Sequence, residues 1–324
     1  MDILKKDIFR ISLNSKKNKN QYYSKEIIRE NIEMYSMLLP VLILIFIFLY
    51  VPIYGVVIAF QDYLPGKPFL SFDGSIQWVG FKHFLKFINS IYFGRLIKNT
   101  LVLSGLNLIF GFWIPILFAL IINEITRLKY KKFVQTASYL PYFISKVIVA
   151  GLVISFTSKI GIVNNFLSIF GVDPQNYMLN AKAFPIIYTI TNVWSNFGFE
   201  SILYFATIST IDPCLYEATR VDGGNRLHQA WYITLPGLKN VIAIKLILAV
   251  GHLLTTNKDL ILLLYTNSTY ETADVIETYV YRLGIEEGLF SYTAAIGFFM
   301  AIIGFSLTFV VNKISNRLTG SGLW

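Results

Sequence analysis

Several ionisable and amide side chains lie inside stretches of sequence that are otherwise apolar. They are Lys146, Glu200, Lys258 and Asp259, with the polar neighbours Asn192, Asn196, Asn257 and His252. Charged groups are costly in an apolar environment, so they usually face a cavity or another protein group. These residues therefore suggest a polar path through a membrane protein. The alternative is that they snorkel at helix ends or form hydrogen bonds between helices.

One group has residue types that bind sugars, because a pyranose ring has an apolar face and a polar rim. Trp194, Asn196 and Phe197 lie within one turn of each other in an apolar stretch. We take Trp194 and Asn196 as candidate substrate contacts. We extend the candidate pathway to Asn257, Lys258 and Asp259. The alternative for the aromatic residues is packing, or a belt at the membrane interface.

Residues for catalysis or metal binding do not occur together. Cys214 is the single cysteine, and His83, His228 and His252 are far apart. Gly66-Lys67 is followed by proline and lacks the glycine-rich lead of a phosphate-binding loop. We therefore predict no catalytic residue, no metal site and no cofactor in this chain, which is not expected to be an enzyme.

The composition is that of a membrane protein. The chain has 324 residues, of which 55% are hydrophobic and 15% charged, whereas soluble domains are about 25% charged. The formal net charge is +9, and much of the basic excess precedes the first apolar run. Basic residues beside a membrane span orient it and contact lipid head groups, so we expect membrane lipid and not nucleic acid as a partner.

Six stretches are long and apolar enough to form transmembrane helices. We place these spans at about 34–60, 101–122, 137–156, 184–208, 241–265 and 294–311. The expected class is an all-α membrane protein with a basic cytoplasmic segment, 1–33, followed by one six-helix domain, 34–324. Lys and Arg are more numerous in the segments that would face inward with a cytoplasmic N-terminus. The bias predicts that both termini are cytoplasmic.

The cytoplasmic loop 212–236, between the fourth and fifth spans, has strong local signals for two short helices in an L. Asp212 is a good N-cap, and Pro213 suits the first helical position. Gly223 can end the helix in the left-handed conformation, and Asn225 can cap a second turn or two. Pro236 should prevent this second helix from running on into the next span.

The same segment resembles the EAA loop of ABC importer permeases. The shared pattern is Glu-Ala-Ala, three residues, glycine, nine residues, then Ile-x-Leu-Pro. It is matched here by Glu217, Ala218, Gly223, Ile233, Leu235 and Pro236, whereas Thr219 replaces the second alanine. The resemblance implies that this loop is the coupling helix, which docks on an ATP-binding subunit. We include Asp222 among the coupling positions. The alternative is a capped hairpin without a partner.

The resemblance extends over about 36–324 and is closest to the maltose-type permeases that take up oligosaccharides. Matching segments include 50–60, 140–145, 149–152, 211–213, 274–282 and 322–324. Two departures affect the pathway. Lys146 stands where an aromatic residue is usual, and Thr255–Asp259 replaces an Asn-x-Gly-Phe-Asp pattern.

The resemblance implies a type I ABC importer permease fold in the cytoplasmic (inner) membrane. Its expected partners are a second homologous permease, two ATP-binding subunits that hold ATP and magnesium, and an extracytoplasmic solute-binding protein. The expected substrate is a carbohydrate, and an oligosaccharide in particular. The alternatives are an ABC permease for a non-sugar solute, and an ion-coupled secondary transporter.

Overall fold

Apolar stretches of the sequence fold into helices in the computed structural model, which describes residues 25–70, 76–320 and 322–323. Within these ranges the one isolated pairing of extended backbone joins Gln61 to Trp78. The predicted all-α class is therefore confirmed. Residues 1–24 of the predicted basic segment, and Trp324 at the end of the resemblance, lie outside the described residues.

Fewer helices than predicted meet the length and apolarity of a membrane span. Within the described residues they are Arg29–Phe60, Phe93–Asn123, Lys146–Ser168 and Phe290–Arg317. A fifth span results if Arg226–Gly237 and Lys239–Gly251, which meet at 62°, are taken together. The structure thus has four or five candidate spans where the sequence predicted six.

The first, second and sixth predicted spans are present as helices. The first is α2 (Lys25–Ile45), continued by η1 (Phe46–Tyr50), α3 (Val51–Ile53) and η2 (Tyr54–Phe60); the second is α5 (Phe93–Asn123) and the sixth is α17 (Phe290–Thr319). Pro115 lies inside α5 without ending it, as expected for a helix with neighbours that can satisfy the freed carbonyl.

The third predicted span was wrong as a single helix. The chain forms α6 (Leu128–Phe143) and α7 (Lys146–Thr157), and Ile144 and Ser145 between them are extended. The two halves pack mainly on different partners. Helix α6 packs on α9, where the ring centres of Tyr142 and Phe199 lie 3.9 Å apart, while α7 packs mainly against α14. This difference in packing explains a break that a run of apolar residues does not reveal.

The fifth predicted span is also broken. It consists of α13 (Lys239–Gly251) and α14 (Lys258–Leu264), joined by irregular backbone at 252–257. The Thr256 N–H and hydroxyl both donate to the Glu277 carboxylate at 2.6 Å. These bonds replace the helical bonding that the linker gives up.

The fourth predicted span coincides with α9 (Phe184–Ile208), although α9 is not among the helices apolar enough to count as a span. Threonine, serine and asparagine side chains explain this lower apolarity. Gly198 lets α9 approach α6 closely, because a Cβ there would lie 2.0 Å from the Ser138 carbonyl oxygen. The helix is therefore central to the packing despite its polar residues.

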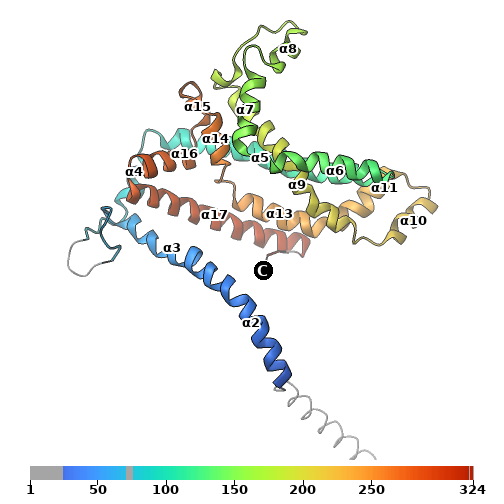
Figure 1. Cartoon of the computed structure of the whole chain (residues 1–324), viewed down its shortest axis with the longest axis horizontal. Coiled ribbons are helices and arrows are strands. Elements are labelled where there is room, and N and C mark those ends of the chain that lie inside the picture. The colour runs from blue at the N-terminus through green and yellow to red at the C-terminus, as the bar shows by residue number, and fades with distance from the viewer. Residues whose placement is uncertain (1–24, 71–75, 321, 324) are drawn as a thin grey trace, which may run out of the picture.

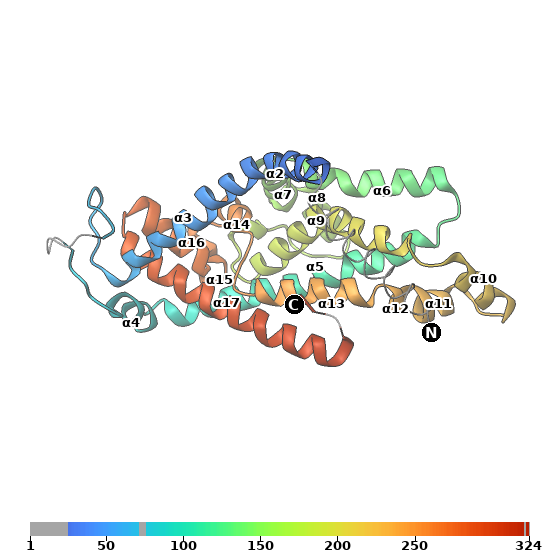
Figure 2. The same ribbon diagram turned by 90° about the horizontal axis from the view of Figure 1, so that it is seen from below.

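The remaining helices are short. They are α4 (Lys82–Ile88), α8 (Ile162–Ser168), η3 (Tyr177–Leu179), α10 (Pro213–Val221), α11 (Arg226–Gln229), η4 (Ala230–Thr234), α12 (Leu235–Gly237), η5 (Asn267–Thr269), α15 (Tyr270–Ala273), α16 (Ile276–Tyr281) and η6 (Arg282–Glu286). In Figures 1 and 2, α4 lies at one end of the long axis and α10 and α11 lie at the other.

The N-terminal helix stands apart from the rest of the chain. Figure 1 shows α2 running away from the other helices, and the most apolar window of Arg29–Phe60 has no buried residue. Among the described residues, η2 at the end of this N-terminal arm, Arg29–Phe60, is the part that packs on the other helices, namely on α17 and α4.

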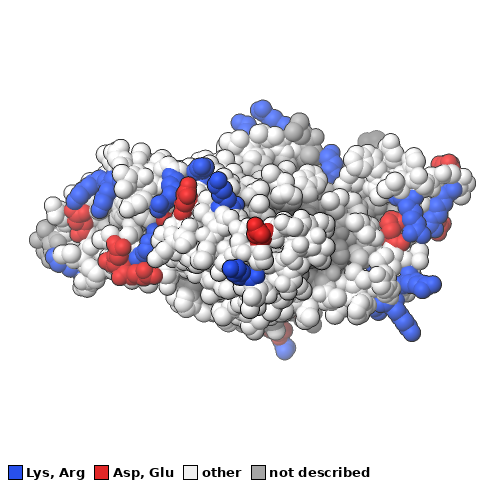
Figure 3. Space-filling model, turned by 90° about the horizontal axis from the view of Figure 1, so that it is seen from above, with Lys and Arg blue, Asp and Glu red and all other residues white. Residues whose placement is uncertain are grey.

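Charged side chains are unevenly distributed over the surface. Figure 3 shows a group of them at the end where α10 and α11 lie, separated from the others by mostly uncharged surface. Such a surface fits a chain whose middle faces lipid or other apolar helices.

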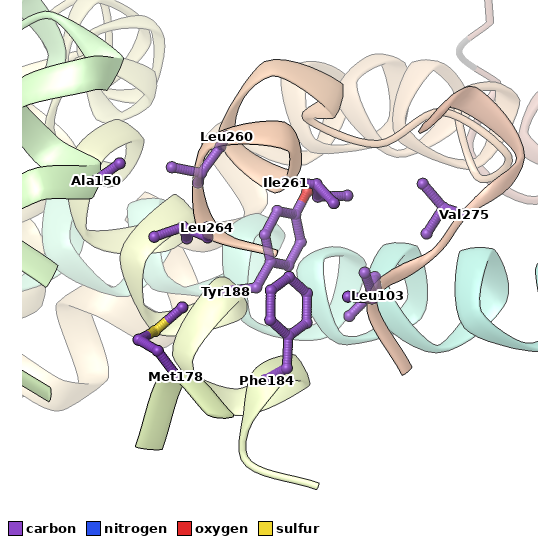
Figure 4. Packing of buried hydrophobic residues seen from close by; sticks show 10 residues of the cluster. Leu103, Ala150, Met178, Phe184, Tyr188, Leu260, Ile261, Leu264 and Val275 are labelled. Atoms are coloured by element: carbon purple, nitrogen blue, oxygen red, sulfur yellow. The ribbon is translucent and has the colours of Figure 1, made fainter. Parts of the chain in front are cut away.

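The buried core lies along α5, which contributes to three clusters. Leu96 packs near the α4 end, Leu103 in the middle, and Phe112 and Ile116 toward the α10 end. Figure 4 shows the middle cluster, in which Phe184 and Tyr188 of α9 lie between α5 and α14. This central helix therefore connects the two ends of the molecule.

Candidate functional site

The predicted L-shaped hairpin is present and begins as expected. The Asp212 carboxylate accepts a hydrogen bond from the Cys214 N–H at 2.9 Å, and Pro213 occupies the first position of α10. Gly223 follows the helix with a φ of +79°, a conformation that is nearly free for glycine but costs other residues. Both the predicted N-cap and the glycine stop are confirmed.

The second arm of the hairpin is longer than the predicted turn or two. The Asn225 side chain accepts a hydrogen bond from the His228 N–H at 2.9 Å, which confirms it as the cap of α11. The helical path then continues through η4 and α12 to Gly237 and bends by 62° before α13. Pro236 therefore does not end this helix itself; the bend falls just after it, at buried Leu238. We call residues 212–237 the hairpin.

The hairpin is fixed to α5. The Arg226 guanidinium donates to the Glu124 backbone oxygen at 3.0 Å, and its Nε lies 3.9 Å from the Glu124 carboxylate. Glu124 is the residue that ends α5. The two arms also hold each other, because the Tyr216 and Thr234 hydroxyls lie 3.0 Å apart. The hairpin is therefore in direct contact with the C-terminal end of α5.

The hairpin exposes several large apolar side chains among its charged residues. Val221, Leu227 and Trp231 are 88%, 79% and 67% exposed. Large apolar side chains that gather on one exposed surface mark an interaction site. The hairpin thus has a rigid base on α5 and an apolar tip that this chain leaves without a partner among the described residues.

The coupling positions proposed from the sequence lie on this hairpin. Glu217, Ala218, Asp222, Gly223 and Pro236 are exposed, whereas Ile233 and Leu235 are half-buried. The Glu217 side chain also borders a cavity of about 1020 Å³ between the hairpin, the end of α5 and the end of α9.

A chain of hydrogen bonds joins three helices and the linker between α13 and α14 near the middle of α5. Lys146 Nζ donates to Asn257 Oδ1 at 3.0 Å, and Asn257 Nδ2 donates to Asn192 Oδ1 at 2.9 Å. Asn192 Nδ2 in turn donates to Asn107 Oδ1 at 2.7 Å. We call these four residues the polar network. It lies where α6 gives way to α7 and α13 to α14, so both helix breaks occur at the same place.

The open end of the network borders a cavity. Lys146 Nζ also lies 3.3 Å from Asp259 Oδ2, and both side chains are more than half exposed. A hollow of about 350 Å³ at this point is lined by Tyr142, Lys146, Ser195, Asn196 and Asn257, among others. The structure thus brings the predicted pathway residues Asn196, Asn257 and Asp259 close to Lys146.

Two other predicted pathway residues lie elsewhere. Lys258 points toward Tyr281, with its Nζ 5.4 Å from the ring centre, and borders a different groove. Trp194 lines an almost wholly apolar groove with Phe110 and Ile190. Neither side chain joins the polar network.

A second polar hollow, of about 280 Å³, lies deeper in the bundle. Glu200 of α9 and Lys245 of α13 face each other there at 3.8 Å, with His252 and Asn196 also in the lining. The pairing gives Glu200 a protein partner, which is the arrangement expected for an intramembrane carboxylate.

Sequence reasoning missed Asn107. A lone amide in the middle of the second apolar stretch was the available signal, because an amide there needs a partner on another helix. Among the described residues, no group of three or more His, Cys, Asp or Glu residues is placed to hold a metal ion.

Residues 111–320 match the family described as the binding-protein-dependent transport system inner membrane component. The matched segment covers the hairpin, most of the polar network and the last helix. The chain belongs to this family. The permease is thus a multi-pass inner-membrane component of a binding-protein-dependent transporter, as the EAA loop resemblance predicted, and it is not an enzyme.

Curated relatives align along most of the permease. It is 42% identical over 292 residues to the polygalacturonan/rhamnogalacturonan transport system permease protein YteP of Bacillus subtilis, covering 90% of each chain. The trehalose/maltose transport system permease protein MalF of Thermococcus litoralis is 29% identical and aligns with 71% of this chain and 76% of its own length.

Solved structures show the same fold. The permease is 44% identical to a chain of a bacterial alginate ABC transporter crystallised with an alginate pentasaccharide-bound periplasmic protein. The TM-score is 0.82, and the alignment covers 93% of this chain and all of that one. The type I importer fold expected from the sequence therefore follows from homology.

Proposed function

We propose that this permease carries an oligosaccharide across the cytoplasmic membrane as one of the two membrane subunits of an ATP-driven importer. The observation that carries this proposal is the hairpin, whose base is fixed to α5 through Arg226 and Glu124 and whose apolar tip is exposed. That combination suits a part that receives force from another subunit.

The substrate class rests on relatives and on the residues of the pathway. YteP is named for polygalacturonan and rhamnogalacturonan, and the structural neighbour for alginate. The cavity beside the polar network offers amides, a hydroxyl and the Tyr142 ring. These are groups that bind the polar rim and the apolar face of a sugar.

The exposed hairpin supports two ATP-binding subunits as partners, one for each permease of a pair. Those subunits would hold the ATP and magnesium, so this chain needs no cofactor of its own. ATP binding would favour one arrangement of the permease pair over another, and the hairpin would transmit that preference to α5.

The N-terminal arm supports a second, homologous permease. An apolar helix with no buried residue in its most apolar window needs either lipid or another subunit around it. The exposed Lys146 and Asp259 point the same way, because a charged pair is better accommodated on a shared polar path than against lipid. A solute-binding protein outside the membrane would deliver the substrate.

The proposed topology has six crossings with both termini in the cytoplasm. It consists of Arg29–Phe60, α5, α6 with α7, α9, α13 with α14, and α17, so that the polar network lies between the two faces of the membrane. The hairpin then lies on the same side as the basic residues before α2, in agreement with the excess of Lys and Arg on the inner face.

Gly223→Asp tests the coupling role. The left-handed φ of +79° and a new charge at the exposed tip should prevent docking of the ATP-binding subunits. We expect the variant to insert into the membrane but to lose oligosaccharide uptake and substrate-stimulated ATP hydrolysis in the complete transporter.

Gly171→Asp is the matched control. Gly171 also has a left-handed φ, +77°, and open space around it, but it follows α8 far from the hairpin. Its uptake should stay close to that of the unchanged permease. Normal uptake by Gly223→Asp would refute the coupling role.

A further inference from the structure

Lys146 provides the ammonium at the end of the polar network that borders a cavity. Its Nζ is held by Asn257 at 3.0 Å and by Asp259 at 3.3 Å, while about half of the side chain stays exposed. A positive charge at this point of the path needs a reason beyond packing.

Pairing with Asp259 does not explain why position 146 carries a positive charge. Asp259 is 63% exposed, and ion pairs between exposed groups are worth little. Asn257 needs no ammonium to hold it, because its amide already donates to Asn192 and its backbone N–H to the Tyr188 hydroxyl at 2.9 Å. A neutral side chain would therefore serve the fold equally well.

We propose that Lys146 binds a carboxylate of the transported sugar, so that the permease carries acidic, uronate-containing oligosaccharides. In the empty path Asp259 holds the ammonium. When a sugar carboxylate enters the cavity, it replaces the Asp259 oxygen as the acceptor from Lys146 Nζ. The ammonium thus never lacks a counter-charge, and the exchange is reversible, as transport requires.

The surrounding groups fit such a ligand. Asn196 and Ser195 line the same cavity and can bond to hydroxyl groups of the sugar ring. Bonds between ionised partners are stronger than those to neutral hydroxyls, so Lys146 would provide the charge selectivity of the site. This inference rests on the proposed oligosaccharide transport and narrows its substrate class.

The test uses the complete transporter in proteoliposomes, with its binding protein saturated by trigalacturonate. The readout is the number of sugars moved per ATP hydrolysed. We expect Lys146→Met to lower this ratio roughly tenfold or more, because a charge-assisted bond is lost. Lys146→Arg should restore it, and Lys159→Met, which removes an exposed lysine before α8, should leave it unchanged.

A double variant separates substrate binding from simple charge pairing. Asp259→Asn alone should still move trigalacturonate, whereas Lys146→Met combined with Asp259→Asn should stay defective. Normal transport by the double variant would mean that Lys146 only neutralises Asp259, and would overturn the inference. Unchanged transport by Lys146→Met would overturn it as well.

The unchanged permease distinguishes this inference from the function on which it rests. Uptake of neutral galactotriose but not of trigalacturonate would reject the acidic class and leave oligosaccharide transport standing. Failure to move either sugar, or any other in an oligosaccharide panel, would reject both proposals.

Discussion

The Arg282 guanidinium lies 3.1 Å from the carboxylate of Asp274, a side chain with no solvent exposure. Arg95 of α5 approaches the same carboxylate at 3.2 Å, and the Thr278 hydroxyl donates to it at 2.9 Å. One buried carboxylate therefore joins the start of α5 to the segment that precedes α17.

We expect Asp274→Ala to destabilise the permease by about 3–5 kcal/mol, because two guanidiniums would lose their buried counter-charge. The free energy of unfolding in mixed micelles measures this loss. Asp173→Ala, which removes an exposed carboxylate after α8, should change stability by less than about 0.5 kcal/mol. Equal losses in the two variants would contradict the role of the buried pair.

The single cysteine reports on the docking of the hairpin. Cys214 is exposed at the start of α10, and its hydrogen bond with Asp212 raises the pKa of the thiol above its usual value. The raised pKa leaves less thiolate at neutral pH, so the labelling is done at mildly alkaline pH. Because Cys214 is exposed, maleimide should react with it faster in the permease pair alone than in the complete transporter. Docked ATP-binding subunits would cover this position.

A cysteine on the opposite side provides the control for labelling. In a Cys214→Ser background, Ser168→Cys places the thiol on exposed α8. Its labelling rate should not respond to the ATP-binding subunits. If Cys214 labels equally fast with and without those subunits, the hairpin does not dock on them.

The polar network should couple α5 to α9. Asn107 and Asn192 share a hydrogen bond of 2.7 Å, and such bonds between membrane helices are worth about 0.6–2 kcal/mol. A double-mutant cycle with Asn107→Ala and Asn192→Ala should give a coupling free energy of unfolding in that range. Strictly additive effects would show that the two amides act independently.

The contact between α4 and the segment after η2 should lose stability in acid. Lys82 donates to Asp62 at 2.6 Å and, with His83 nearby, lowers the pKa of this carboxyl below its ordinary 3.8. A lowered pKa in the folded state means that the contribution is complete above the unfolded value and is lost as pH falls through the folded one. The melting temperature of the unchanged permease should therefore fall more steeply below about pH 4 than the melting temperature of Asp62→Asn.

Local sequence signals predicted the hairpin well. Asp212, Gly223 and Asn225 act through bonds or dihedral angles within a few residues of themselves, so their effect can be read from the chain alone. For Pro236, the prediction that the second helix does not run on into the next span is confirmed, although the stop lies two residues further on. Its helix bends only at Leu238, where burial in the core decides the position of the bend.

Long-range contacts explain what the sequence did not predict. The breaks before Lys146 and before Lys258 depend on Asn257 and Glu277, which bond across more than twenty residues or to other helices. A hydropathy average over a window of residues does not register such contacts. It therefore joins the two halves of each broken span into one predicted helix. The predicted pathway residues Asn257 and Asp259 lie together beside Lys146, whereas Trp194 and Lys258 lie away from them, and the pathway role of all four stays a prediction.

Helix α5 carries Arg95, beside Asp274, in its first turn, and its C-cap Glu124 accepts a hydrogen bond from Arg226 of the hairpin. At 1.5 Å per residue its 31 residues span about 45 Å, and Asn107 lies close to the midpoint. If the polar network holds the middle of α5 in place, a tilt imposed at one end of the helix moves the opposite end in the other direction. The gate for the sugar would then sit at the polar network, where the smallest movement is required.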